Sequence, residues 1–191
     1  RALPQPPGTR LLSERAAPGH AQGLPAIYAR ELAQRGFRDD PAQAAAIAEL
    51  ERVRREVMRA ETVSRTARLL TRFSGRPAYG APVRGAYLWG GVGRGKTWLM
   101  DLFFQNLAVT RKQRSHFHRF MYDVHERLRG LQERADPLSE VATAIAESSR
   151  VLCFDELFVD DIADAMILGG LFRHLVERRV TLVFTSNVPP A

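Results

Sequence analysis

One segment of this chain constrains its fold more than any other: Gly90-Gly91-Val92-Gly93-Arg94-Gly95-Lys96-Thr97. It matches the pattern G-x-x-x-x-G-K-[ST], and it stands between an apolar stretch that ends at Trp89 and an apolar helical pattern that begins at Trp98. Glycines let a loop curl so that successive backbone N–H groups point at phosphate oxygens, and the helix that follows adds its positive N-terminal end. The segment therefore predicts a phosphate-binding loop over residues 90–98, with Lys96 at the β- and γ-phosphates and the Thr97 hydroxyl on Mg²⁺.

The composition is that of a globular protein. The chain has 191 residues, of which 45% are hydrophobic and 26% are charged, and 28 Lys and Arg against 21 Asp and Glu give a formal charge of +7. No uncharged apolar run reaches the roughly 18–20 residues of a transmembrane helix, and the first residues lack the apolar core of a secretory signal. A single cysteine, Cys153, excludes an internal disulfide and a cysteine-cluster zinc site. We therefore expect a soluble, cytoplasmic protein.

Turn-forming residues and charge divide the chain into four parts. Residues 1–25 are rich in Pro and Gly, and we expect them to be flexible. Residues 26–75 are expected to form a small basic helical region, because residues 1–80 contain 14 Arg against 8 acidic residues. The turn-rich residues 76–83 are expected to form a linker. Residues 84–191 then form the domain that contains the phosphate-binding loop.

Two helices are predicted in the basic region. The first spans Ala26–Gln34 and ends at Gly36. The second begins after Asp40, which we expect to cap it together with Gln43 at the capping-box position, and it extends to about Phe73. Its polar face carries many arginines among glutamates. This face is either a solvated surface with Arg–Glu pairs or a docking surface for an acidic partner or nucleic acid.

Strand and helix patterns alternate after residue 84. The strand candidates are Ala86–Trp89, Ser115–Phe117, Val151–Phe154 and Val180–Thr185. Helical patterns occupy Lys96–Leu107, Met121–Glu133, Leu138–Glu147 and Ile162–Arg178. Such alternation predicts an α/β fold with helices on both faces of a central parallel sheet. Ligands of such sheets bind beyond the carboxyl ends of the strands, so we expect functional residues to follow the strands directly.

Two carboxylates follow the third strand candidate. Val151–Phe154 is apolar throughout, and Asp155 and Glu156 come next. Asp155 has the position of the acid that holds Mg²⁺ in P-loop proteins, and Glu156 has that of a general base for the attacking water. Taken alone, two acids after a strand are more typical of a helix cap. Together with a phosphate-binding loop in the same sheet, they predict a catalytic site for nucleotide hydrolysis.

A polar segment also follows the last strand candidate. Val180–Thr185 leads into Ser186 and Asn187, at the edge of the sheet where we expect the phosphate-binding loop. There the amide of Asn187 can hydrogen-bond the γ-phosphate or the attacking water. The alternative is a turn-forming Asn before Val188-Pro189. One strand end carries the glycine loop, another carries the two acids and the third carries Asn187. This combination favours a catalytic role for Asn187.

The remaining reactive side chains form no second catalytic set. His116 and His118 are two positions apart, so we expect them to share one face of a strand. No third residue is evident that would complete a metal site with them. Cys153 lies inside an apolar strand, and we expect it to pack in the core. Only two residues are Lys, Lys96 and Lys112. The predicted chemistry therefore rests on the three strand ends.

Five segments carry a resemblance to a known family: Tyr87–Phe103, His116–Met121, Leu152–Glu156, Asp161–Met166 and Thr185–Pro190. Together they resemble the AFG-one-like family of AAA+ ATPases, and in particular its bacterial cell-division branch. The resemblance extends from about Tyr28 to Ala191 and departs from the family pattern at Leu157 and Asp160. It implies a P-loop NTPase fold of the AAA+ type.

The resemblance also implies an activity and a partner. Members of this branch couple Mg²⁺-dependent ATP hydrolysis to remodelling of a protein, which is the tubulin-like division GTPase FtsZ. The family pattern further implies a fifth strand, a helical lid and an arginine finger that acts on a neighbouring subunit, none of which is located here. We therefore expect an incomplete AAA+ module that ends after the strand before Asn187. We expect it to self-associate through an arginine finger outside this chain and to hydrolyse ATP weakly by itself.

Two other functions fit the same motifs. A helicase loader is also a P-loop AAA+ switch, and its basic N-terminal helix would bind nucleic acid in a strongly salt-dependent manner. The long family-like segments argue against this function, so nucleic acid is not the expected partner. A non-enzymatic interaction module would use residues 1–80 to dock a partner, with the nucleotide serving only to order the fold.

Overall fold

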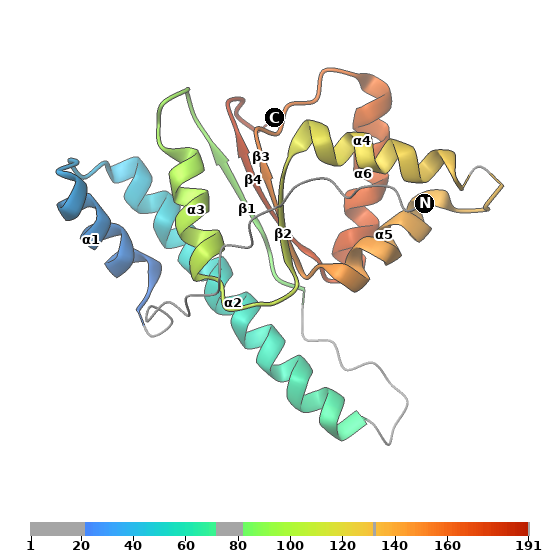
Figure 1. Cartoon of the computed structure of the whole chain (residues 1–191), viewed down its shortest axis with the longest axis horizontal. Helices are drawn as coiled ribbons and strands as arrows, with labels where there is room; N and C mark the ends of the chain where they lie inside the picture. Colours follow the sequence, from blue (N-terminus) through green and yellow to red (C-terminus); the bar gives the residue numbers. More distant parts are fainter. Residues whose placement is uncertain (1–21, 72–81, 132, 191) are drawn as a thin grey trace, which may run out of the picture.

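A four-stranded parallel sheet forms the centre of the protein (Figure 1). The computed structural model describes residues 22–71, 82–131 and 133–190, without the side chains of residues 64–71. Most of the predicted flexible segment and most of the predicted linker lie outside these residues. The strands are β1 (Ala86–Trp89), β2 (Lys112–His116), β3 (Val151–Asp155) and β4 (Thr181–Ser186), arranged in the order β1-β4-β3-β2.

Helices cover both faces of this sheet, which gives the three layers seen in Figure 1. One face carries α1 (Leu24–Arg35), α2 (Pro41–Thr71) and α3 (Lys96–Asn106). The other face carries α4 (Phe117–Arg129), α5 (Pro137–Ser148) and α6 (Ile162–Glu177). None of the helices in the described ranges combines the length and the apolar character that a membrane span requires. The predicted α/β fold with a central parallel sheet is confirmed.

Strand β3 is buried along its whole length and contributes to the two larger hydrophobic cores. Val151 and Cys153 pack on the side of α1, α2 and α3, whereas Leu152 and Phe154 pack on the side of α4, α5 and α6. A parallel strand that is covered on both faces is apolar at every position for this reason. Burial also raises the pKa of the Cys153 thiol to about 12. The predicted core position of this cysteine is confirmed.

The predicted position of β2 was wrong. The strand spans Lys112–His116 instead of Ser115–Phe117, and it pairs with β3 from Lys112 opposite Val151 to His116 opposite Asp155. β2 lies at the edge of the described sheet and consists of polar residues, so it lacks the apolar pattern by which the other strands were found.

The predicted start of α4 was wrong for a related reason. The helix begins at Phe117, directly after β2, and ends at Arg129, whereas the sequence pattern indicated Met121–Glu133. Phe117 is buried in a small core beneath α4 and α6, so its apolar side chain belongs to the helix and does not extend the strand. His116 therefore ends a strand while His118 lies in the first turn of a helix, and the expected shared strand face of these two residues does not exist.

The predicted start of α2 after Asp40 is confirmed, but the predicted capping box is wrong. Asp40 caps the helix as expected, because its carboxylate accepts a hydrogen bond from the N–H of Ala42 at 2.9 Å. Gln43 forms no capping box. Its side chain instead accepts a hydrogen bond from the Tyr28 hydroxyl and donates one to the carbonyl of Arg94, both at 3.1 Å. The helical region thus contacts the predicted phosphate-binding loop.

Gly85, which precedes β1, lies so close to β4 that no side chain fits. A Cβ at this position would stand 1.7 Å from the carbonyl oxygen of Leu182. We expect Gly85→Ala to lower the free energy of unfolding by about 3 kcal/mol or more, because β1 and β4 must move apart.

A matched control is Gly169→Ala in α6, where a Cβ meets no neighbouring atom within 4 Å. Alanine favours a helix over glycine by up to about 1 kcal/mol, so this variant should be as stable as the wild type or slightly more stable. Urea unfolding followed by circular dichroism compares both variants. A Gly85 variant that matches the wild type would contradict the pairing of β1 with β4.

Candidate functional site

A hollow of about 400 Å³ lies at the carboxyl ends of β1, β3 and β4. Residues 92–98 line it on one side, and Glu156 lines it together with the segment 185–187. β4 pairs in parallel with both β1 and β3, so the chain leaves all three strands at the same rim of the sheet. The structure therefore brings the predicted phosphate-binding loop, Glu156 and Asn187 together.

The loop between β1 and α3 has the backbone conformation for which its glycines are suited. Gly93 and Gly95 both have a φ of +78°, a value that residues with a Cβ rarely adopt. A Cβ would meet no atom within 4 Å at any of three positions, Gly90, Gly91 and Gly93. No side chain caps the start of α3. An open loop that leads into an uncapped helix start is the arrangement in which backbone N–H groups bind anions.

Lys96 connects this loop to the end of β4. Its Nζ donates hydrogen bonds to the carbonyl oxygens of Gly90 and Gly91, both at 2.8 Å, and to Oδ1 of Asn187 at 2.9 Å. An ammonium group has three donors, and all three are used. Two of the predicted site residues, which are separated by 91 positions in the sequence, are therefore in direct contact.

The end of β4 also holds the backbone that carries Glu156. This residue has a φ of +58°, in the left-handed region, and its N–H donates to the hydroxyl of Thr185 at 3.1 Å. The next N–H, that of Leu157, donates to the Thr185 carbonyl at 2.7 Å, and the Ser186 hydroxyl donates to the Leu157 carbonyl at 2.7 Å. Thr185 and Ser186 thus fix the position of the exposed Glu156. Thr185 ends the predicted strand and Ser186 follows it, so the signal that indicated Asn187 applies to these two residues as well.

Asp155 differs from its neighbour because its side chain is 8% exposed and bound by Arg114. Nε and Nη2 of Arg114 donate to the two carboxylate oxygens of Asp155, at 2.7 and 3.2 Å. The same guanidinium also forms a hydrogen bond to Asp101 of α3 and contacts the carbonyl oxygen of Thr97 at 3.4 Å. Burial lowers the pKa of Arg114, but the hydrogen bonds to the two carboxylates outweigh it and raise this pKa above its usual value. Arg114 was not among the predicted site residues, because the predicted strand began one residue after it.

The helical region completes the rim on the other side of the loop. Trp98 donates from Nε1 to Glu31 of α1 at 3.1 Å, and its ring lies 5.5 Å from that of Tyr28 and 6.4 Å from that of Phe37. A second hollow of about 410 Å³ lies between these helices and the loop, and shares Gly93, Gly95 and Trp98 with the first. Trp98 therefore borders both hollows.

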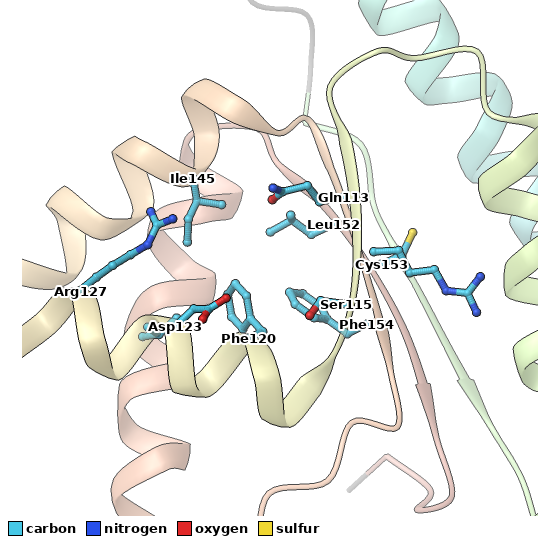
Figure 2. A pocket seen from close by; sticks show the side chains of 11 residues that line it. Gln113, Ser115, Phe120, Asp123, Arg127, Ile145, Leu152, Cys153 and Phe154 are labelled. Carbon is cyan, nitrogen blue, oxygen red and sulfur yellow. The ribbon is translucent and has the colours of Figure 1, made fainter. Parts of the chain in front are cut away.

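A third hollow lies away from this rim (Figure 2). It has a volume of about 220 Å³ and is enclosed by β2, β3, α4 and α5. Figure 2 shows Asp123 and Arg127 of α4 on the side of Leu152 and Phe154, whereas Cys153 points to the opposite side of the sheet. None of the residues that the sequence pattern singled out for phosphate chemistry lines this hollow. The candidate functional site is therefore the rim at β1, β3 and β4.

The fold and the loop define an α/β P-loop protein. The family model described as AFG1-like ATPase matches residues 23–191, and the chain belongs to this family.

Two curated relatives are similar to this chain over long stretches of sequence. The cell division protein ZapE of Escherichia coli K12 is 48% identical over 169 residues, which cover 85% of this chain and 45% of that protein. Lactation elevated protein 1 homolog B of Danio rerio is 47% identical over 120 residues, which cover 57% and 24% of the two chains. The present chain thus spans less than half the length of these relatives. Domain III of the Thermotoga maritima replication initiation protein DnaA is similar in structure with a TM-score of 0.44 and 16% identity, over 67% of this chain and 51% of that chain.

Proposed function

We propose that this chain binds ATP together with Mg²⁺ and hydrolyses it to ADP and phosphate. The observation that carries the proposal is the position of Lys96, which links the glycine loop to Asn187 in the hollow that Glu156 also lines. A cation, an amide and a carboxylate thereby face one space. Phosphoryl transfer to water needs these groups, because its catalysis depends on neutralising phosphate charge and positioning the water.

Each residue of the hollow has a distinct task in this proposal. Backbone N–H groups of residues 90–95 bind phosphate oxygens, and Lys96 exchanges its carbonyl partners for the β- and γ-phosphates. The Asn187 amide donates to the γ-phosphate or accepts from the attacking water. The Glu156 carboxylate takes a proton from that water. The fixed backbone around Glu156 serves to keep this carboxylate at one place.

Thr97 and Asp155 are the residues that would hold Mg²⁺. A hydroxyl and a carboxylate are oxygen donors, which this hard cation prefers. The elements that carry the two residues are joined by Arg114, whose guanidinium contacts both Asp155 and the Thr97 carbonyl. The donor set therefore fits the ion. When bound, Mg²⁺ neutralises charge on the phosphates.

The second hollow is the proposed site of the nucleotide base. It adjoins the loop and is bordered by two aromatic side chains, Phe37 and Trp98, on which a flat base can stack. Gln43 and Asp40 at its wall supply hydrogen-bonding groups. Gln43 also holds the loop itself through the Arg94 carbonyl.

Replacing Gln43 by alanine tests this part of the site. We expect Gln43→Ala to weaken binding of a fluorescent ATP analogue about three- to tenfold, because one or two hydrogen bonds of about 1 kcal/mol each are lost. Gln34→Ala is the control, since Gln34 is an exposed glutamine of α1. Fluorescence titration at a fixed Mg²⁺ concentration measures both variants. Equal affinities of the two would show that Gln43 has no part in nucleotide binding.

We further propose that the complete protein acts in the cytoplasm during cell division, where it couples ATP hydrolysis to remodelling of FtsZ polymers. The name of the Escherichia coli relative supports the role in cell division, and the family resemblance of the motifs supports FtsZ as the partner. Self-association that places an arginine of one subunit at the γ-phosphate of the next belongs to the same proposal.

Phosphate release by the complete protein, measured with and without FtsZ polymers, tests the proposed function. We expect release that requires Mg²⁺ and that changes when polymers are added. Retention of ATP without any release, under both conditions, would contradict hydrolysis and favour a nucleotide-ordered interaction module.

A further inference from the structure

A single guanidinium joins the two elements that carry the proposed Mg²⁺ ligands. Arg114 lies in β2, and its side chain reaches Asp155 at the end of β3 and Asp101 in α3. It also contacts the carbonyl of Thr97, in the first turn of α3. Its own side chain is only 18% exposed. This arginine is therefore bound by both of the elements that carry the proposed Mg²⁺ ligands, α3 and β3.

We infer that Arg114 is a positioning residue for Mg²⁺ binding: it orients the Asp155 carboxylate and fixes the distance between that carboxylate and Thr97. The inference rests on the proposed function, because it concerns the same nucleotide site. It adds a residue that does not itself reach the nucleotide and that acts through Asp155.

The geometry of the contact supports this role. Nε and Nη2 of Arg114 bind both oxygens of Asp155, which fixes the plane of the carboxylate as well as its position. A carboxylate has about four lone-pair sites, so two remain for water or a metal ion. The bidentate contact thus leaves Asp155 able to act as a ligand.

Burial explains why Asp155 needs such a partner. Its side chain is 8% exposed, and a buried carboxylate without a partner is expensive to keep charged. Without Arg114, the carboxylate turns toward another donor, and Mg²⁺ binding has to reverse that change first. Lysine cannot replace the arginine fully, because one ammonium group cannot present the planar fork that contacts Asp155 and Asp101 together.

The experiment measures how strongly Mg²⁺ enhances nucleotide binding. The affinity of a fluorescent ATP analogue is determined with excess Mg²⁺ and with EDTA. The ratio of the dissociation constant in EDTA to the dissociation constant with Mg²⁺ is compared among variants. For Arg114→Gln we expect this ratio to fall about tenfold or more relative to the wild type, while the affinity in EDTA changes less than about threefold. Arg114→Lys should recover part of the ratio.

Two further variants separate positioning from general stability. Arg111→Gln removes an arginine that directly precedes β2 and whose side chain donates to the Glu147 carbonyl, and it should leave the ratio unchanged. Asp101→Asn removes a charged partner of Arg114 at a side chain that is 44% exposed, and should lower the ratio in the same direction by a smaller factor. Thermal unfolding of every variant shows which are folded. Asp101→Asn therefore tests the inference even where Arg114→Gln does not fold.

The outcomes distinguish this inference from the proposed function. A wild-type chain that binds the analogue more tightly with Mg²⁺, beside folded Arg114 and Asp101 variants with the same ratio or a larger one, overturns the inference alone. A wild-type chain whose binding does not respond to Mg²⁺ overturns both the inference and the proposed Mg²⁺ site. A lowered ratio in the Arg114 and Asp101 variants, with Arg111→Gln unchanged, supports the inference.

Discussion

Replacing Lys96 by alanine should weaken ATP binding about a hundredfold or more, which corresponds to about 2.8 kcal/mol. Lys96 supplies the positive charge of the glycine loop, and in the structure its three donors join the loop to Asn187. Its loss removes charge-assisted hydrogen bonds to the phosphates, and it also releases the loop from the end of β4. Isothermal titration calorimetry of the chain with Mg²⁺ and a non-hydrolysable ATP analogue measures the change.

The chain contains a matched control, since Lys112 is its only other lysine. Lys112 donates to the carbonyl of Leu107 at 2.7 Å and lies over the ring of Phe104, at the end of α3 that is distant from the loop. We expect Lys112→Ala to lower the melting temperature but to leave ATP affinity within about twofold of the wild type. Unchanged affinity in the Lys96 variant, or an equal loss in both, would contradict the assignment of the loop.

The second large effect is expected on hydrolysis. Glu156→Gln in the complete protein should lower the turnover of ATP by a factor of about 10² to 10⁴, because glutamine has the shape of glutamate but cannot accept the proton of the attacking water. Nucleotide affinity should stay within about threefold of the wild type, since no hydrogen bond that holds the Glu156 backbone involves its side chain. Single-turnover phosphate release and fluorescence titration measure the two quantities separately.

Glu147→Gln serves as the control for this variant. Glu147 is exposed and lies near the end of α5, beside a hollow that shares no residue with the candidate site. The Glu147→Gln variant should hydrolyse ATP at the wild-type rate. If Glu156→Gln also retained that rate, the base would have to be another group, and the catalytic role proposed for this carboxylate would be wrong.

The parts of the fold and site that are local in sequence were predictable. The glycine loop is contiguous, and its spacing alone indicates how backbone N–H groups and Lys96 are arranged. The meeting of Glu156 with Asn187 was also predictable, although they lie far apart in sequence. Parallel strands end at the same rim, so residues that directly follow them gather at that rim, and Glu156 and Asn187 line the same hollow there.

The contacts made by Arg114 and Gln43 were not predictable in this way. Neither residue follows an apolar strand, and neither belongs to the phosphate-binding loop. Arg114 lies in a polar edge strand, where periodicity gives no signal, and its partner Asp155 is determined by the register of β2 against β3. Gln43 matched a capping box by its spacing from Asp40, but the packing of α2 against the loop places the Arg94 carbonyl within its reach. Tertiary contacts of this kind depend on register and helix packing, which a single sequence does not reveal.

The most direct test is a crystal structure of this chain with Mg²⁺ and a non-hydrolysable ATP analogue. We expect the triphosphate to lie in the loop of residues 90–97, with the γ-phosphate about 3 Å from both Lys96 Nζ and the Asn187 side chain. We expect Mg²⁺ between Thr97 and Asp155. A triphosphate bound elsewhere, or one that lies in the loop but has its γ-phosphate beyond the reach of Asn187 and Glu156, would contradict the account.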